Sequence, residues 1–234
     1  MIFWLLGINH TISFVFYFFR FLVLSAFICK KNLSMIIALI SQKGGVGKTT
    51  LALNLADALR TLGKTVALVE TDEQQSLARI AELTDNLPLA RYSNIAELER
   101  MAEGEQFVVV DTPPYLSRGT EEVLSIADFA LIPIQASLLD AQAVADSIDM
   151  VHEAQQQNPN LKAAIVLNRV EHQKRSHEAH IMKVLDGYGV PVLQTKVRDL
   201  IAYRRALMAG GIFHIDAEKE QKEVKSLLLD VLSL

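Results

Sequence analysis

Cysteine is almost absent from this sequence, and acidic residues are absent from its first 34 positions. The chain has 234 residues and one cysteine, Cys29. A disulfide within the chain is therefore impossible, and residues 35–234 cannot build a metal cluster on cysteine ligands. Those residues carry 20 basic and 27 acidic side chains, a formal net charge of −7. A domain of this charge repels nucleic acid overall, so it can bind a phosphate backbone only through a local basic patch.

The start of the chain differs in composition from the rest. Residues 1–34 hold nine of the 16 aromatic residues, and positions 12–29 are almost continuously apolar. Arg20 interrupts this run, and two lysines follow it. We therefore treat 1–34 as an apolar N-terminal extension and expect one domain over 35–234.

Three interpretations of this extension compete. As a membrane anchor it is short, because a span needs about 20 apolar residues, and Arg20 costs about 2.5–3.5 kcal/mol on insertion. As a secretory signal it lacks a basic start and a small-residue cleavage site. In the third interpretation, translation begins at Met35, just before the first predicted strand. We favour the third over a membrane anchor, and we expect no membrane partner unless residues 1–34 are part of the protein.

A glycine-rich segment lies between a predicted strand and a predicted helix. Residues 35–41 form a short apolar run rich in β-branched side chains, and residues 51–60 repeat with helical spacing. The loop between them can aim backbone N–H groups and the positive end of a helix dipole at one anion. It therefore predicts a P-loop with these phosphate-binding residues: Gly44, Gly45, Val46, Gly47, Lys48, Thr49 and Thr50.

Two side chains of this loop carry the predicted chemistry. Lys48 would neutralise the β and γ phosphates, and the Thr49 hydroxyl would ligate Mg²⁺. A glycine-rich turn without a ligand would explain the glycines, but it would not explain a Lys-Thr pair at this spacing. We therefore predict ATP and Mg²⁺ as cofactors.

Acidic residues follow two further apolar runs. Asp111 ends the run over 107–110 and precedes Pro113 and Pro114, so it is predicted to hold Mg²⁺ directly or through water. Asp72 follows a predicted strand over 64–70. Strand ends in a doubly wound sheet face the ligand crevice, so Asp72 would point toward the γ phosphate. The alternative is that Asp72 only stabilises the start of the helix that follows.

Strand and helix patterns alternate along residues 35–234. This alternation predicts an α/β fold, with a doubly wound, mostly parallel sheet and helices on both faces. The further predicted strands cover 128–134 and 161–167, and the further predicted helices cover 74–83, 95–102, 137–157 and 217–232.

The loop departs from the common G-x-x-x-x-G-K-[ST] pattern at its start, where Gln42 replaces the first glycine and Lys43 adds a second lysine. The string K-G-G-V-G-K-T-T resembles the deviant Walker A loop of the ParA/MinD family of ATPases. The strings V-V-V-D-T-P-P and I-P-I-Q-A-S-L-L-D resemble the same family. The resemblance covers residues 35–234 and is closest to small plasmid and chromosome partition proteins of the ParA type. The family's D-x-D-P-Q motif is kept only in part, because Glu70 and Glu73 replace its first aspartate and its proline.

The resemblance implies an ATPase that works as a homodimer. Lys43 would reach the phosphates held by the other subunit, Lys48 would bind those of its own, and Asp72 would orient water or help hold Mg²⁺; these three form the implied catalytic set. Mg-ATP would drive the dimer onto non-specific DNA, and a ParB-like partner would stimulate the hydrolysis that releases it. The implied location is cytoplasmic and nucleoid-associated. The nitrogenase iron protein shares the loop, but the scarcity of cysteine excludes that branch.

The second half of the chain offers weaker candidates. Asn168 ends the predicted strand over 161–167, where an asparagine reads the adenine edge in this family or merely caps a loop. Residues 172–205 form the only basic region of the acidic domain over 35–234, with a formal charge of +4. They are either a solvated helix face or a DNA surface. The predicted DNA contacts are Lys174, Arg175, Lys196, Arg198, Arg204 and Arg205.

Two other functions compete with DNA partition. One is a membrane-associated positioning or cell-division ATPase of the MinD type, for which residues 1–34 would act and DNA would be irrelevant. MinD ends in an amphipathic membrane helix, but residues 217–232 have balanced charges on their polar face, so we expect them to pack on the core. The other is a metabolic enzyme with the same loop, such as dethiobiotin synthetase. No signature of a small-substrate pocket supports it.

Overall fold

The computed structural model describes residues 34–82, 84, 87, 89–90, 92–115, 117–170, 175–198 and 201–234. The interpretations of residues 1–33 lie outside this part of the chain. No helix among the described residues is long and apolar enough to cross a membrane.

The core is a six-stranded sheet in which every pair of neighbouring strands is parallel. The order across the sheet is β3-β2-β4-β1-β5-β6, so β1 lies between strands that come much later in the chain. The strands are β1 (Met35–Leu39), β2 (Val66–Glu70), β3 (Leu89–Ala90), β4 (Phe107–Asp111), β5 (Phe129–Gln135) and β6 (Lys162–Asn168).

The two faces of the sheet are both buried. Ile37 and Leu39 of β1 belong to one hydrophobic cluster, and Ile36 and Ala38 belong to the other. This alternation follows from the two-residue period of a strand. Burial on both faces explains why the strands are continuous apolar runs in the sequence.

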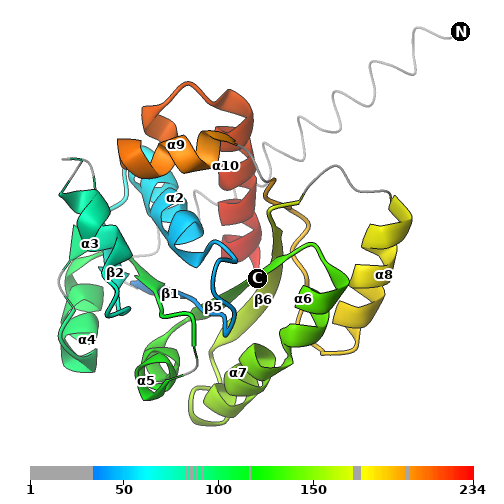
Figure 1. Ribbon diagram of the computed structural model, residues 1–234. Helices are drawn as coiled ribbons and strands as arrows, with labels where there is room; N and C mark the ends of the chain where they lie inside the picture. Colours follow the sequence, from blue (N-terminus) through cyan, green and yellow to red (C-terminus); the bar gives the residue numbers. More distant parts are fainter. Residues whose placement is uncertain are drawn as a thin grey trace, which may run out of the picture. The chain divides into compact units, whose positions relative to one another are not determined.

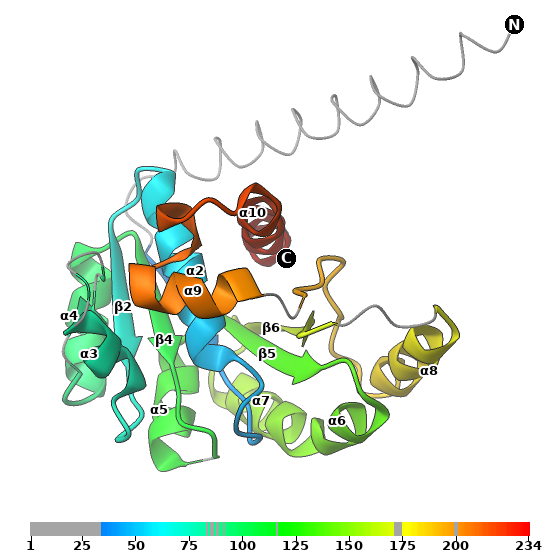
Figure 2. The ribbon, with the colours of Figure 1, turned by 45° about the horizontal axis from the view of Figure 1, so that its top comes forward.

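Helices cover each face, as predicted (Figure 1). One layer contains α2 (Lys48–Thr61), α3 (Ser76–Ala81), α9 (Ile201–Ala209), the 3-10 turn η1 (Ile212–His214) and α10 (Glu218–Ser233). The other contains α4 (Ile95–Gly104), α5 (Arg118–Ile126), α6 (Leu138–Ala143), α7 (Ala145–Gln157) and α8 (Arg175–Asp186). Figure 2 shows α9 lying across α2, with α10 beside them.

Two helix predictions have clear outcomes. The single helix predicted over 137–157 is wrong, because α6 ends at Ala143 and α7 starts at Ala145. Val144 between them keeps right-handed helical angles, φ −76° and ψ −17°, but its ψ is far from the ideal α value of about −42°. The core packing of the last helix is confirmed, because Val224, Leu227, Leu228 and Val231 are all buried.

Candidate nucleotide-binding site

The predicted P-loop connects the central strand β1 to α2. Gly45 has φ 75° and Gly47, the residue before the first turn of α2, has φ 95°. These left-handed angles favour glycine at both positions. The N–H of Gln42 donates to Ser147 Oγ of α7 at 3.1 Å, which fixes the entry to the loop. The first N–H groups of α2 therefore face the carboxyl edge of the sheet, where helix termini bind phosphate.

Lys48 lies behind the loop and is 6% exposed. Its Nζ donates to the carbonyl of Ser41 at 3.3 Å, so the side chain crosses beneath the loop. Burial lowers the pKa of Lys48, and the charges of Asp111 and Asp72 oppose that shift. An ammonium group that is buried beside carboxylates is well placed to bind a polyphosphate.

Asp111 and Thr49 meet at the foot of the loop. Thr49 Oγ1 donates to Asp111 Oδ2 at 2.6 Å, and Asp111 is 2% exposed. Among the described residues, no hydrogen-bond partner reaches the buried Oδ1 of Asp111. Burial raises the pKa of Asp111 to about 7, and the charges of Glu70 and Asp72 contribute in the same direction.

These features fit Mg²⁺. A buried, unpartnered carboxylate oxygen beside a hydroxyl needs a positive partner, and Mg²⁺ prefers oxygen ligands. The described residues contain no group of three His, Cys, Asp or Glu side chains that could hold a metal by themselves. Mg²⁺ usually keeps several waters and takes phosphate oxygens as further ligands. Thr49 and Asp111 would therefore hold the ion together with the bound phosphates.

Asp72 lies in the turn between β2 and α3, beside Asp111. Its Oδ1 accepts from the N–H of Gln74 at 3.0 Å, and its carbonyl accepts from the N–H of Gln75 at 3.1 Å. Its charge acts on both Lys48 and Asp111, so the structure brings these predicted site residues together. Its catalytic role and its role toward Mg²⁺ stay predictions.

Lys43 is bound within its own chain. Its Nζ forms an ion pair with Asp140 in the first turn of α6. The Lys43 side chain is 49% exposed, whereas Asp140 is 4% exposed. Asp140 also accepts from Ser137 Oγ at 2.5 Å. The sequence analysis did not single out Asp140, although it is the last residue of the family-like string I-P-I-Q-A-S-L-L-D.

Asn168 contacts the P-loop directly. Its Nδ2 donates to the carbonyl of Val46 at 2.6 Å, and a Cβ at Gly47 would lie only 2.3 Å from the same nitrogen. Loop capping, one of the two predicted roles, is therefore present. A cavity of about 150 Å³ lies beside this contact, and Gly47, Thr50, Asn168 and Tyr203 are among its lining residues. The adenine contact stays a prediction.

The predicted DNA contacts lie on several elements. Lys174 lies outside the described residues, and Arg175 begins α8. Arg204 and Arg205 are exposed on α9. Arg198 donates from its backbone N–H and its Nε to Glu223 of α10, at 2.8 Å and 3.3 Å. Lys196 lies in the same loop, whereas Arg198 and Arg204 also line the 150 Å³ cavity beside Gly47.

Residues 37–211 match the family model described as the CobQ/CobB/MinD/ParA nucleotide binding domain. The chain therefore belongs to the CobQ/CobB/MinD/ParA family of nucleotide-binding proteins. This match confirms the predicted resemblance to ParA and MinD. It also agrees with the P-loop geometry described above.

Individual relatives support the same assignment. The chain is 34% identical over 214 residues to "Maintenance of carboxysome distribution protein A" of Halothiobacillus neapolitanus, covering 86% of this chain and 98% of the relative. It is 30% identical over 188 residues to "Chromosome-partitioning ATPase Soj" of Thermus thermophilus, covering 60% of this chain and 76% of the relative.

Solved structures confirm the fold. The ATP complex of Cyanothece McdA(D38A) is similar with a TM-score of 0.67 and 14% identity, over 87% of this chain and 98% of that one. The cobyrinic acid a,c-diamide synthase of Mycobacterium smegmatis, with an ATP analogue and magnesium, is similar with a TM-score of 0.62 and 23% identity. That likeness covers 75% of this chain and 93% of the other. ATP and Mg²⁺, the predicted cofactors, thus occur in proteins of this fold.

Proposed function

We propose that this protein is an ATP-switched positioning ATPase, which distributes a cargo by binding DNA as a dimer and leaving it after hydrolysis. The observation that carries this proposal is the placement of Lys43. Its side chain lies half exposed at the open side of the P-loop, held by buried Asp140 rather than placed beneath the loop as Lys48 is. A half-exposed lysine can exchange this ion pair for the phosphates of a nucleotide bound by another subunit.

Exposed apolar side chains beside Lys43 support a subunit contact at this face. Leu139, next to Asp140, is 76% exposed, and Tyr115, which follows Pro113 and Pro114, is 49% exposed. Pro114 lies near the loop, because a Cβ at Gly44 would be 3.7 Å from its Cβ. Large apolar side chains exposed around a site are typical of an interaction surface.

ATP hydrolysis would use the P-loop residues of one subunit together with Lys43 of the other. The loop N–H groups and Lys48 bind the phosphates, while Thr49 and Asp111 hold Mg²⁺, which supplies charge neutralisation at the phosphate oxygens. Asp72 would orient the attacking water. Lys43 of one subunit would complete the site of the other, so hydrolysis is slow until a partner protein stabilises that arrangement.

The names of the relatives support a positioning role. One is named for carboxysome distribution and the other for chromosome partitioning, so the cargo is either a DNA replicon carried through a ParB-like protein or a large protein assembly. Arg204 and Arg205 on the exposed side of α9 are the described residues best placed to contact DNA phosphates. We therefore propose a cytoplasmic, nucleoid-associated protein.

No observation on the described residues favours the MinD-type alternative. The apolar face of α10 packs on the core, so that helix is not a surface membrane anchor in this structure.

Retention on DNA tests the proposal. The full chain is expected to bind non-specific duplex DNA with ATP and Mg²⁺, to lose it with ADP, and to lose it as salt rises, because phosphate contacts release counterions. Replacing both Arg204 and Arg205 by alanine should weaken retention, whereas replacing the exposed Lys219 and Lys222 of α10 should not. Equal retention with ATP and ADP, or binding to anionic vesicles in place of DNA, would contradict the proposal.

A further inference from the structure

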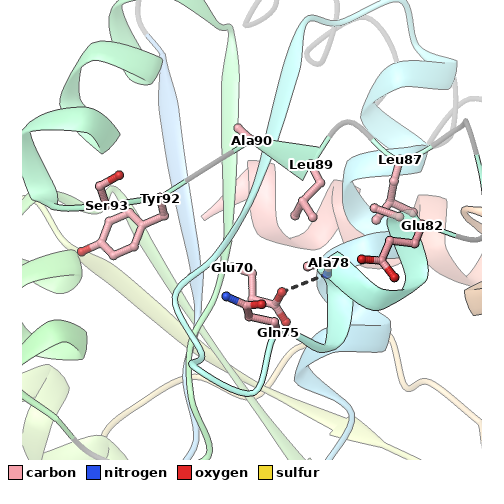
Figure 3. Close-up of a pocket in the computed structure, with 10 residues that line it drawn as sticks. Glu70, Gln75, Ala78, Glu82, Leu87, Leu89, Ala90, Tyr92 and Ser93 are labelled. Atoms are coloured by element: carbon pink, nitrogen blue, oxygen red, sulfur yellow. Dashed lines mark hydrogen bonds between the residues drawn. The ribbon is translucent and has the colours of Figure 1, made fainter.

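A second, larger cavity lies at the end of β2, away from the P-loop. Its volume is about 720 Å³, and it is lined by the end of β2, by α3 and by the segment around β3. Figure 3 shows Glu70 near the middle of the cavity, with Ala78 of α3 and Glu82, which follows α3, on one side and Tyr92 and Ser93 on the other. Two lining residues connect the cavity to the nucleotide site: the charge of Glu70 acts on Asp111, and the N–H of Gln75 donates to the carbonyl of Asp72.

The lining combines an apolar wall with carboxylates. Ala78, Leu87 and Leu89 supply aliphatic surface, and Glu70 and Glu82 supply negative charge. The described lining residues include no lysine or arginine. Lysine and arginine side chains have an apolar stem and a charged end, so a wall of this kind suits them.

Glu70 connects this cavity to the turn that carries Asp72. Its two carboxylate oxygens accept from the N–H groups of Leu77 at 2.8 Å and Ala78 at 3.0 Å, in the first turn of α3. Gln75, which precedes α3, makes no side-chain cap and has φ 52°, an unfavourable angle for a residue with a Cβ. Glu70 therefore replaces the missing cap and holds the far end of the turn against β2.

The sheet edge beside the cavity is open to a further segment. In the described part of the chain, β3 pairs with β2 on one side only and ends the strand order. An open edge strand can accept an extended peptide through its backbone groups. Because the edge can bind the backbone of an extended segment, the cavity beside it suits a side chain of that segment better than a free small cation.

We propose that this cavity docks a lysine or arginine side chain from an extended segment of a partner protein. The charged end binds Glu82 and shares Glu70 with the amides of α3. The hydrogen bonds from Leu77 and Ala78 then weaken, and the turn carrying Asp72 becomes free to change its position. The inference rests on the proposed function, because it gives a physical route by which a partner alters hydrolysis.

Disulfide trapping with a lysine-like probe tests this site. The full chain with Cys29→Ser and Ser93→Cys carries one thiol in the cavity lining, and Ser125→Cys in the same background carries one on exposed α5 as a control. Each protein is equilibrated with equal amounts of cystamine, which attaches an ammonium group, and 2-hydroxyethyl disulfide, which attaches a neutral group of similar size. Peptide mass spectrometry gives the ratio of the two adducts.

We expect residue 93 to favour the amine about three- to fivefold over the control position, the range of a partly exposed ion pair. Glu82→Gln should return that ratio to the control value. Amide exchange at Leu77 and Ala78 should be roughly tenfold faster in the amine adduct than in the neutral adduct, because a hydrogen bond to a carboxylate is weakened.

The two readouts separate the parts of the inference. Equal adduct ratios at residues 93 and 125 would overturn the docking site. A preference without faster exchange at Leu77 and Ala78 would overturn the coupling through Glu70. Neither measurement depends on ATP hydrolysis, so both results can be interpreted even if the proposed function is wrong.

Discussion

The two lysines of the P-loop have opposite surroundings. Lys48 is buried, crosses beneath the loop to the Ser41 carbonyl and lies near Asp111. Lys43 is half exposed, and a side chain of a helix distant in sequence holds it. Residues inside one subunit therefore suffice to bind the nucleotide. Lys43, in contrast, is held by an ion pair with Asp140, and a contact with another subunit can replace that pair.

This contrast predicts that binding and turnover can be separated by mutation. Substitutions of the buried residues Lys48 and Asp111 should weaken nucleotide binding or its dependence on Mg²⁺. Substitutions in the exposed half should leave binding intact and alter assembly and hydrolysis.

The largest effect is expected for Lys48→Ala. Hydrogen bonds to charged groups contribute about 1.5–3 kcal/mol, so ATP affinity should fall about 10- to 100-fold. Titration calorimetry with ATP and Mg²⁺ measures this, with Lys64→Ala as a control at a partly exposed lysine outside the loop. Unchanged affinity would show that Lys48 does not contact the phosphates.

Asp111→Asn should remove the effect of Mg²⁺ on ATP binding. The substitution keeps the size of the side chain and its acceptor for Thr49, but it removes the buried charge that the ion would neutralise. Without metal, the variant should be at least as stable as the wild type, because no buried carboxylate remains unpartnered. Thermal melts with and without Mg-ATP check both statements. A variant that is still stabilised by Mg²⁺ would exclude Asp111 as a ligand.

Lys43→Ala should spare binding and reduce turnover. We expect ATP affinity within about twofold of the wild type, but a loss of ATP-dependent dimers and a fall in hydrolysis of about 100-fold, the effect of removing one charged donor from a transition state. Light scattering and phosphate release measure these quantities. Asp140→Asn is the matched variant, since it frees Lys43 without removing it. Wild-type dimerisation and turnover in Lys43→Ala would remove the intersubunit role.

The smallest effect concerns stability, at the buried Asp57 of α2. Its Oδ2 accepts from the N–H of Phe213 at 2.9 Å, and Oδ1 lies 3.2 Å from His214 Nε2. Burial raises the pKa of Asp57, against the Phe213 N–H and the charges of His214 and Arg60. A raised pKa gives stability that is complete below the unfolded value of about 4 and is lost as pH rises through the folded value.

Asp57→Asn should therefore lose less stability than the wild type as pH rises from about 4. Urea unfolding at a series of pH values measures the difference, and exposed Asp186→Asn serves as the control. Parallel curves for the wild type and Asp57→Asn would contradict the assignment.

The sequence was most informative where a local pattern determines the backbone. The P-loop and the strand that ends at Asp111 are both determined within a few residues. The doubly wound arrangement follows from the alternation of apolar runs. Such features need no knowledge of distant contacts.

The contacts that the prediction missed join distant residues. Lys43 and Asp140 are 97 positions apart, and neither has a local pattern that names the other. In the sequence, Glu70 was only a replacement for the first aspartate of the D-x-D-P-Q motif. In the structure, its carboxylate accepts the N–H groups of Leu77 and Ala78, seven and eight residues later, and so caps α3. One signal was available: Asn54 and Asp57 are polar residues inside an apolar helical repeat, and both accept backbone N–H groups of residues 212–213.

The central position of β1 also sets the order in which the protein can be assembled. β1 pairs with β4 and β5, which are translated about 70 to 90 residues later. At about 5–20 residues per second, the P-loop waits several seconds outside the ribosome before either neighbouring strand exists. Asn168, which holds the Val46 carbonyl, emerges later still. The nucleotide site is therefore complete only after most of the domain has been synthesised.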